Sequence, residues 1–271
     1  MAQITHELDG MRAERRVRAR VKAIRAAVPV PAPFAPPGRV ALALLLTVAS
    51  GLVWSLATAA ARAEDHAVVF AGGMMDHAKF GYLGGTIALP GSALGRGFAI
   101  RGAAFVGDYS YKGGAGQHVD ANFSGGEISG LYQLSGGWGW MNVGPGIRYT
   151  DTSLAPSDPS NRRHGRQGEL IISADGARLL APWRFDWYGA YGTRLSDYQV
   201  RASLTHDLGP VVRAGLEASF EGDPTYDLQR VGPYAAIRLG DKSELQVSVG
   251  VSGQTGRGTG AYLRTGVHHS F

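Results

Sequence analysis

Cysteine is absent from the 271 residues, and charged residues make up only 18% of them. Without cysteine, disulfide bonds, thiolate catalysis and cysteine-ligated zinc are excluded. Beyond residue 63 there is no apolar run long enough to cross a membrane as a helix, and no sustained 3.6-residue apolar period. All but three of the 40 glycines also lie there, and a glycine inside a helix costs about 1 kcal/mol relative to alanine. A helical membrane protein is therefore excluded, and a helical core is disfavoured.

The N-terminal segment has the three parts of a secretory signal. Basic residues crowd positions 12–25, an apolar run covers 40–61, and Ala61 and Ala63 form an A-x-A site. This order predicts a cleavable leader and signal peptide over residues 1–63 and a mature chain of residues 64–271. The alternative is a transmembrane anchor, because the apolar run is long enough to span a bilayer.

Removing this segment changes the charge balance. The whole chain has 27 basic and 22 acidic residues, of which the first 63 positions hold nine and three. The remainder is left with a net charge of −1, so the basic pI of about 9.5 belongs mainly to the leader. Nucleic acid is for this reason not expected as a partner.

The mature chain alternates between apolar and polar residues with the period of a β-strand. Leu245, Val247 and Val249 share one face of the segment 243–253, and the residues between them are polar or small. Similar alternation occurs in 98–108, 197–207, 211–221 and 228–239.

Twelve strands are predicted, with short links after the even-numbered strands and longer links after most odd-numbered ones. Their ranges are 66–74, 80–90, 96–108, 119–134, 138–150, 167–180, 183–193, 197–207, 211–221, 227–239, 243–253 and 261–271. An even strand count and this rhythm of links are typical of outer-membrane barrels, whose short turns face the periplasm. A soluble β-sandwich shares the alternation but gives no reason for the rhythm. We therefore predict an all-β fold, a closed antiparallel outer-membrane β-barrel of about 12 strands.

The final strand ends on an aromatic residue, Phe271, which shares an apolar face with Leu263 and Val267. In outer-membrane barrels such a strand closes the barrel and serves as an assembly signal. We expect Phe271 at the periplasmic rim, beside the strand that begins near His66. Aromatic residues near strand ends further predict girdles at the membrane interfaces. These residues are Trp138, Trp140, Trp183, Trp187, Tyr149, Tyr198 and Phe271.

The polar faces predict a network of side chains inside the barrel. Its members are Arg101, Glu127, Arg148, Glu169, Asp175, Arg184, Asp186, Arg201, Arg213, Glu217, Arg230, Tyr234, Arg238, Glu244 and Arg264. One interpretation is a set of ion pairs that fills a small barrel. The other is a polar track for a carbohydrate, in which Tyr234, Tyr262 and the Arg–Glu pairs contact hydroxyl or uronate groups. No catalytic residue, metal ligand or cofactor is predicted.

Three other segments carry chemically capable residues. The loop 151–166 is either a site for polysaccharide or Ca²⁺ or simply a solvated, turn-rich loop. The carboxylates of 221–227 form either a glycosidase-like pair or part of a hairpin turn. His268, His269 and Ser270 are similar to the His and Ser of outer-membrane lipid A deacylases, but they fall at the predicted periplasmic end.

Several segments resemble the cellulose biosynthesis protein BcsS family. They are Phe-Val-Gly-Asp-Tyr-Ser-Tyr at 105–111, Tyr-Gln at 132–133 with Gly-Gly-Trp at 136–138, Pro-Ser-Asp-Pro-Ser-Asn at 156–161, Glu-Gly-Asp-Pro-Thr-Tyr-Asp at 221–227, and the C-terminal strand. The resemblance covers about residues 65–271. It implies a role in bacterial cellulose production or export at the outer membrane, and it supplies no catalytic residues.

The expected function is a non-enzymatic outer-membrane barrel that serves cellulose biosynthesis or secretion as an accessory channel or scaffold. Its expected partners are outer-membrane lipid, cellulose or another polysaccharide, and components of cellulose secretion. A narrow oligosaccharide porin is the first alternative. An outer-membrane hydrolase or acyl-modifying enzyme is the second.

Overall fold

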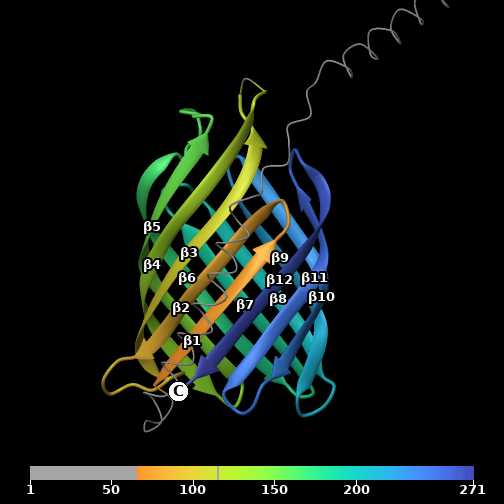
Figure 1. Ribbon diagram of the computed structural model, residues 1–271. Helices are drawn as coiled ribbons and strands as arrows, with labels where there is room; N and C mark the ends of the chain where they lie inside the picture. The colour runs from red at the N-terminus through yellow and green to blue at the C-terminus, as the bar shows by residue number, and fades with distance from the viewer. Residues whose placement is uncertain (1–65, 115) are drawn as a thin grey trace, which may run out of the picture. The chain divides into compact units, whose positions relative to one another are not determined.

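Residues 66–114 and 116–271 of the computed structural model are described, and they form a closed antiparallel barrel of twelve strands (Figure 1). This confirms the predicted all-β barrel. The predicted signal peptide and the boundary at residue 63 lie outside the described residues. Within the described part of the chain, no helix is long and apolar enough to cross a membrane.

The strands follow one another around the barrel in chain order. Their bounds are β1 Ala67–Met75, β2 Ala78–Ala88, β3 Gly97–Lys112, β4 His118–Gly136, β5 Gly139–Ala155, β6 Gly165–Leu180, β7 Trp183–Gly192, β8 Tyr198–Asp207, β9 Val212–Asp223, β10 Tyr226–Arg238, β11 Ser243–Gln254 and β12 Gly258–Ser270. The predicted ranges agree to within a few residues. The largest difference is at the end of β5, where pairing with β4 continues to Ala155 opposite Asp120.

The barrel closes between β1 and β12, whose register runs from Val68 opposite Ser270 to Met75 opposite Leu263. The N–H of His66 donates to the carbonyl of Phe271 (3.0 Å), and the N–H of Phe271 donates to the carbonyl of Ala67 (2.9 Å). The predicted closure of the last strand onto the first is therefore confirmed. We call the barrel end that holds Phe271 the turn end and the opposite end the loop end (Figure 1).

The predicted rhythm of short and long links is wrong at four places. Residues 89–96 form a long link at the turn end, whereas 76–77, 224–225 and 255–257 are short turns at the loop end. These turns are short because the β1–β2, β9–β10 and β11–β12 ladders continue to their last residues. The remaining links are 137–138, 181–182, 208–211 and 239–242 at the turn end, and 113–117, 156–164 and 193–197 at the loop end.

The strands differ in length, and this makes the rim uneven at the loop end. Strands β3, β4, β5 and β6 have 16, 19, 17 and 16 residues, whereas β7 and β8 have 10 each. The long strands rise above the rest of the rim at the loop end (Figure 1). One side of the barrel mouth is therefore taller than the other.

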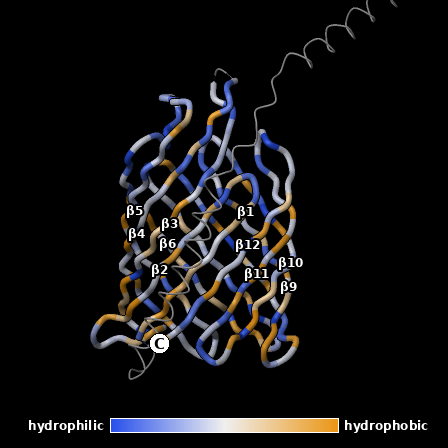
Figure 2. The backbone as a smooth tube through the Cα atoms, in the orientation of Figure 1, coloured by the Kyte–Doolittle hydropathy of each residue, from blue (hydrophilic) through white to orange (hydrophobic). Residues whose placement is uncertain are grey.

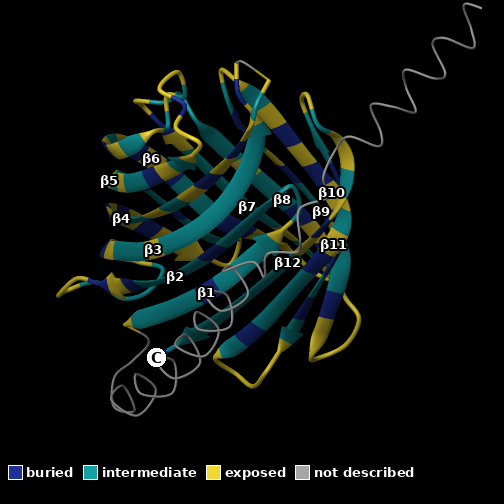
Figure 3. Ribbon diagram, turned by 45° about the horizontal axis from the view of Figure 1, so that its top comes forward, coloured by how far each residue is buried: buried dark blue, intermediate teal, exposed yellow. Residues whose placement is uncertain are grey.

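The outer surface of the barrel is apolar. Side chains such as Ile128, Leu170, Leu216 and Val251 are all more than half exposed, because successive residues of a strand point to opposite faces. Hydrophilic residues gather at the loop end (Figure 2), and exposed and buried residues alternate along the strands (Figure 3). An apolar outer face on a closed barrel suits a lipid environment.

The aromatic girdle is only partly as predicted. Trp138, Trp183 and Tyr149 are exposed on the outside. Trp140 instead lines the inner cavity, because it has the same strand phase as the inward Asn142. Trp187 lies in the middle of β7 beside its register partner Gly176, away from either strand end.

Two further girdle candidates make specific polar or aromatic contacts. Phe271 is 7% exposed, and its ring meets that of His269 edge-on at 4.5 Å between centroids. The hydroxyl of Tyr198 donates to Asp227 Oδ1 at 2.6 Å.

Candidate functional site

The barrel encloses a cavity of about 1680 Å³ that is lined by residues from β1 to β12 and from the loop 156–164. Charged and polar side chains cover one part of its wall, and aromatic rings cover the part formed by β1–β4 at the loop end. Both surfaces arise from strand alternation, which turns every second side chain inward. The cavity is the place where this fold gathers polar chemistry.

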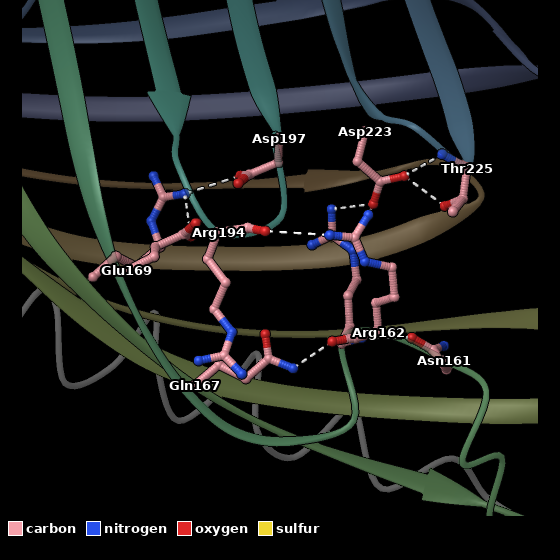
Figure 4. A network of polar contacts seen from close by, with 10 residues as sticks. Asn161, Arg162, Gln167, Glu169, Arg194, Asp197, Asp223 and Thr225 are labelled. Atoms are coloured by element: carbon pink, nitrogen blue, oxygen red, sulfur yellow. Dashed lines mark hydrogen bonds and ion pairs between the residues drawn. The ribbon is translucent and has the colours of Figure 1, made fainter.

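Arg148 of β5 lies at the centre of the largest charged cluster. Its guanidinium contacts Glu127 Oε2 on β4 (3.1 Å), Asp197 Oδ2 (3.1 Å) and Glu169 Oε1 on β6 (3.6 Å). In Figure 4 the Glu169 and Asp197 side chains approach the same guanidinium group. Glu127, Arg148 and Glu169 were predicted to face inward, and all three line the cavity. Asp197 was not among the predicted inward residues, although the predicted strand 197–207 begins with it; it lies in the link 193–197 just before β8.

Two arginines pair with single carboxylates. Arg101 Nη1 on β3 lies 2.7 Å from Asp175 Oδ1 on β6, and Asn142 also donates to Asp175, at 3.0 Å. Arg184 and Asp186 are neighbours on the inner face of β7, where Arg184 Nη2 lies 2.6 Å from Asp186 Oδ1. The Arg101–Asp175 pair links β3 and β6, which are not adjacent in the sheet but approach each other across the curved inner wall of the barrel.

Glu217 of β9 is shared by two arginines. Arg264 Nη1 on β12 lies 3.2 Å from Glu217 Oε1, and Arg201 Nη1 on β8 lies 3.6 Å from Glu217 Oε2. The Glu217 side chain is 2% exposed. A carboxylate this deeply buried needs cationic partners, because an unpaired buried charge is strongly disfavoured.

Two more arginines are nearly enclosed by protein. Arg213 Nη2 lies 2.7 Å from Glu244 Oε1. Arg230 contacts Asp76 Oδ2 at 2.7 Å and Glu221 Oε2 at 3.0 Å. Asp76 was not predicted here, because it falls in a tight turn rather than on a strand face. We use the name charged network for the residues that these ion pairs connect. They are Asp76, Arg101, Glu127, Arg148, Glu169, Asp175, Arg184, Asp186, Asp197, Arg201, Arg213, Glu217, Glu221, Arg230, Glu244 and Arg264.

The two predicted tyrosines lie within this network. Tyr234 is 5% exposed and interacts with Arg213. The Tyr262 hydroxyl lies 2.8 Å from Ser248 Oγ. The predicted Arg238 is different: it is exposed and donates to the carbonyl of Pro210 (3.1 Å). It is the last residue of β10, so it lies at the turn end and joins no ion pair of the charged network.

The loop 156–164 is held at the barrel mouth by Arg163. Both Nε and Nη2 of Arg163 donate to Asp223 Oδ2, at 3.0 and 2.7 Å. The guanidinium also lies 5.7 Å from the centroid of the Tyr226 ring. Asp223 is fixed in turn by the backbone N–H of Thr225 (2.7 Å; Figure 4). Arg163 therefore connects the β5–β6 and β9–β10 hairpins, which are not neighbours in the barrel.

The same loop contacts β3 through Asp158. Tyr111 donates to Asp158 Oδ2 (2.9 Å), and the Ser160 backbone and hydroxyl donate to Oδ1. Hydrogen bonds from Ser160 and then Tyr111 lower the pKa of Asp158, because they favour its charged form. The described residues contain no group of three metal-ligating side chains, and the Asp158 oxygens already have donors. The geometry therefore does not support a Ca²⁺ site here.

Each carboxylate of 221–227 is held by a different donor. Glu221 contacts Arg230, Asp223 contacts Arg163, and Asp227 accepts from Tyr198. These contacts fit carboxylates that fix the rim of the barrel. His268 lines the cavity, whereas His269 lies on the opposite strand face and contacts Ser243 Oγ at 2.7 Å. The two histidines therefore point apart.

Aromatic side chains from β1–β4 form a second part of the cavity wall, a feature that we did not predict. We call this set the aromatic wall. It comprises Phe70, Phe80, Tyr82, Phe105, Tyr109, Tyr111 and Phe123, all of which line the cavity and are partly exposed to it. A signal was present in the sequence, since Phe105 shares the predicted face of Arg101.

A closed, even-stranded antiparallel barrel with an apolar outside and a polar inside defines the class of transmembrane β-barrels. The matching solved structures include a KdgM porin (TM-score 0.45, 12% identity, 75% of this chain and 99% of that chain). They also include the translocator domain of autotransporter NalP from Neisseria meningitidis (TM-score 0.48, 11% identity, 85% and 98%). A third is the transport unit of autotransporter AIDA-I from Escherichia coli (TM-score 0.45, 11% identity, 78% and 92%).

The family model of cellulose biosynthesis protein BcsS matches residues 68–271. The chain belongs to this family, as the sequence resemblance indicated. No curated protein matches the chain.

Proposed function

We propose that the protein is an outer-membrane barrel that serves cellulose biosynthesis by admitting polysaccharide into its interior, as an accessory channel and without catalysis. The observation that carries the proposal is the cavity of about 1680 Å³ inside a barrel whose outside is apolar. Membership of the BcsS family connects it to cellulose. Because most cavity carboxylates are paired with arginines, the wall suits binding better than acid–base chemistry.

Membrane placement is tested by charging the outer surface. Leu216 lies near the middle of β9 and is 63% exposed, whereas Val211 lies just before the strand. Leu216→Arg should cost about 2–4 kcal/mol of folding free energy in lipid, and Val211→Arg about 0–1 kcal/mol. The measurement is denaturant unfolding in lipid vesicles. Equal costs at the two positions would contradict a bilayer around β9.

The role in cellulose is tested with a deletion strain and with the purified full-length protein in a planar bilayer. We expect the strain to lose cellulose yield or to mislocalise cellulose, and the protein to conduct ions. Cellulose loss without conductance would indicate the scaffold version. Conductance with normal cellulose would indicate a porin unrelated to synthesis, and release of new reducing ends from polysaccharide would indicate a hydrolase.

A further inference from the structure

We propose that the aromatic wall is a binding surface for a neutral chain of pyranose sugars, which stacks its ring faces on the aromatic rings. The inference rests on the proposed function and names the ligand chemistry of the same cavity. It starts from how the aromatic rings are placed on the inner face of β1–β4.

Each of four rings lies over an inward-facing glycine of the neighbouring strand. Phe70 is the register partner of Gly84, and Tyr82 is the register partner of Gly72. A Cβ atom added to either glycine would come within 2.6 Å of the ring opposite. The rings therefore occupy the space that the missing side chains leave.

The same pairing recurs on β3 and β4. Phe105 is opposite Gly125, and Phe123 is opposite Gly107. An added Cβ at Gly125 would lie 2.6 Å from the Phe105 ring, and one at Gly107 would also collide with the Phe123 ring. The missing side chains leave these rings room to lie along the wall, and all four rings remain partly exposed to the cavity.

Together the rings form a continuous surface. Phe80 is the centre, with ring centroids 5.8 Å from Tyr82, 6.1 Å from Phe105 and 6.2 Å from Phe123. Tyr109 extends the surface, at 6.1 Å from Phe123 and 6.0 Å from Tyr111. From residue 105 to residue 111 a strand rises about 20 Å. The surface therefore has room for more than one sugar ring in succession.

A pyranose suits the two sides of this cavity. Its ring faces present C–H groups of slight positive charge, which are attracted to the negative π faces, and its edge presents hydroxyl groups. The charged network supplies carboxylate oxygens for those hydroxyls, because the side chains of Glu127, Asp186 and Asp197 line the cavity and stay 17%, 23% and 20% exposed. A wholly apolar ligand would displace water from these acceptors without replacing its hydrogen bonds, which is unfavourable.

The charges favour a neutral sugar over an acidic one. Every arginine of the charged network already has a carboxylate within 4 Å, and Arg148 and Arg230 have more than one. A polyanionic chain would need unpaired cations along its path, as phosphate and carboxylate sites generally do. The network instead presents donors and acceptors of both signs, which serve uncharged hydroxyls.

The test compares two sets of phenylalanine-to-leucine changes in the purified full-length protein. The triple variant Phe80→Leu, Phe105→Leu, Phe123→Leu keeps apolar volume on the wall and removes three π faces. Phe98→Leu is the matched control, because Phe98 is 60% exposed on the outer face, where it packs edge-on against Tyr132. Heat-modifiable gel mobility confirms that each variant forms a barrel. If the triple variant does not form one, the single change Tyr82→Leu takes its place.

Binding of cellohexaose, of an acidic oligogalacturonate and of dodecanoate is measured by calorimetry. We expect wild type and Phe98→Leu to bind cellohexaose alike, the wall variant to bind it about tenfold or more weakly, and oligogalacturonate to bind less well than cellohexaose. Absence of cellohexaose binding by wild type, or equal binding by the wall variant, overturns the proposal. Preference for dodecanoate indicates an amphiphile site and also overturns it. Normal cellulose in the deletion strain, with sugar binding intact, would instead refute only the proposed function.

Discussion

The aromatic wall and the charged network line one cavity but are stabilised in different ways. On β1–β4 a ring fills the space above a glycine, and each contact is apolar and local to two strands. In the charged network, ion pairs join charges from different parts of the chain, and Arg148 alone contacts three carboxylates. Losing one ring leaves a small gap, whereas losing one arginine leaves buried charge without a partner. The charged network should therefore be the more sensitive to single substitutions.

The largest effect is expected at the centre of the charged network. Arg148→Met should lower the free energy of unfolding by about 3–5 kcal/mol, because it leaves Glu127, Glu169 and Asp197 without their shared cation. Arg166→Met is the matched control, since Arg166 pairs with Asp151 while its own side chain is 79% exposed. Its loss should cost only about 0–1 kcal/mol. Urea unfolding in lipid vesicles measures both, and similar costs would contradict the difference in burial.

A smaller effect is expected where the aromatic wall meets a glycine. Gly107→Ala places a methyl group against the Phe123 ring and 2.6 Å from the carbonyl of Lys79. Overpacking of this kind should cost about 1–3 kcal/mol and turn the ring toward the lumen. Gly130 of β4 has open space around its added Cβ, so Gly130→Ala should be close to neutral. The same unfolding assay applies, and an unchanged near-ultraviolet circular dichroism of Gly107→Ala would argue against the ring displacement.

At the mouth, one arginine joins the loop 156–164 to β9. Arg163→Ala should free the loop while changing global stability less than Gly107→Ala, because the contacts it removes lie at the rim. We expect faster proteolysis within 156–164 and larger single-channel current. Arg162→Ala is the neighbouring control, since Arg162 makes an exposed bond to the carbonyl of Arg194. A loop equally protected in both variants would show that Arg163 does not hold it.

The smallest effect concerns pH. Hydrogen bonds from Ser160 and Tyr111 lower the pKa of Asp158 below its ordinary value, which is about 4. The folded-state pKa is depressed, so the contact contributes fully above about pH 4 and is lost as the pH falls through the lowered value. Loop proteolysis should therefore rise at low pH in wild type. Asp158→Asn should show the raised level already near pH 6, and strong pH dependence in that variant would point to another group.

The strand pattern could be predicted because every strand of a barrel alternates inward-facing and outward-facing side chains. Alternation set the inward phase of Arg101, Arg148 and Glu217, and the structure places all three inside. Strand ends were harder, since β5 runs on to Ala155 only because β4 offers it a partner. Local composition does not reveal how far a ladder continues.

The pairing within the cavity could not be predicted from alternation. That Arg264 and Arg201 share Glu217 depends on the register and curvature of strands far apart in sequence. Predicting the aromatic wall also requires the strand registers, because each ring covers a glycine on the adjoining strand. Gly72, Gly84, Gly107 and Gly125 look scattered in the sequence, but each is the register partner of an aromatic residue in the barrel.

The β1–β12 seam has a consequence for the order of folding. Every other strand pair joins neighbours in the chain, so each can form as a local hairpin with little loss of loop entropy. The seam joins the first strand of the barrel to the last, so it can form only after all the other strands are in place. Until then the sheet keeps two unpaired edges, which are open to pairing with other chains. Pairing of residues 258–270 with β1 therefore removes both exposed edges, and it ends the stage at which the open sheet can pair with other chains.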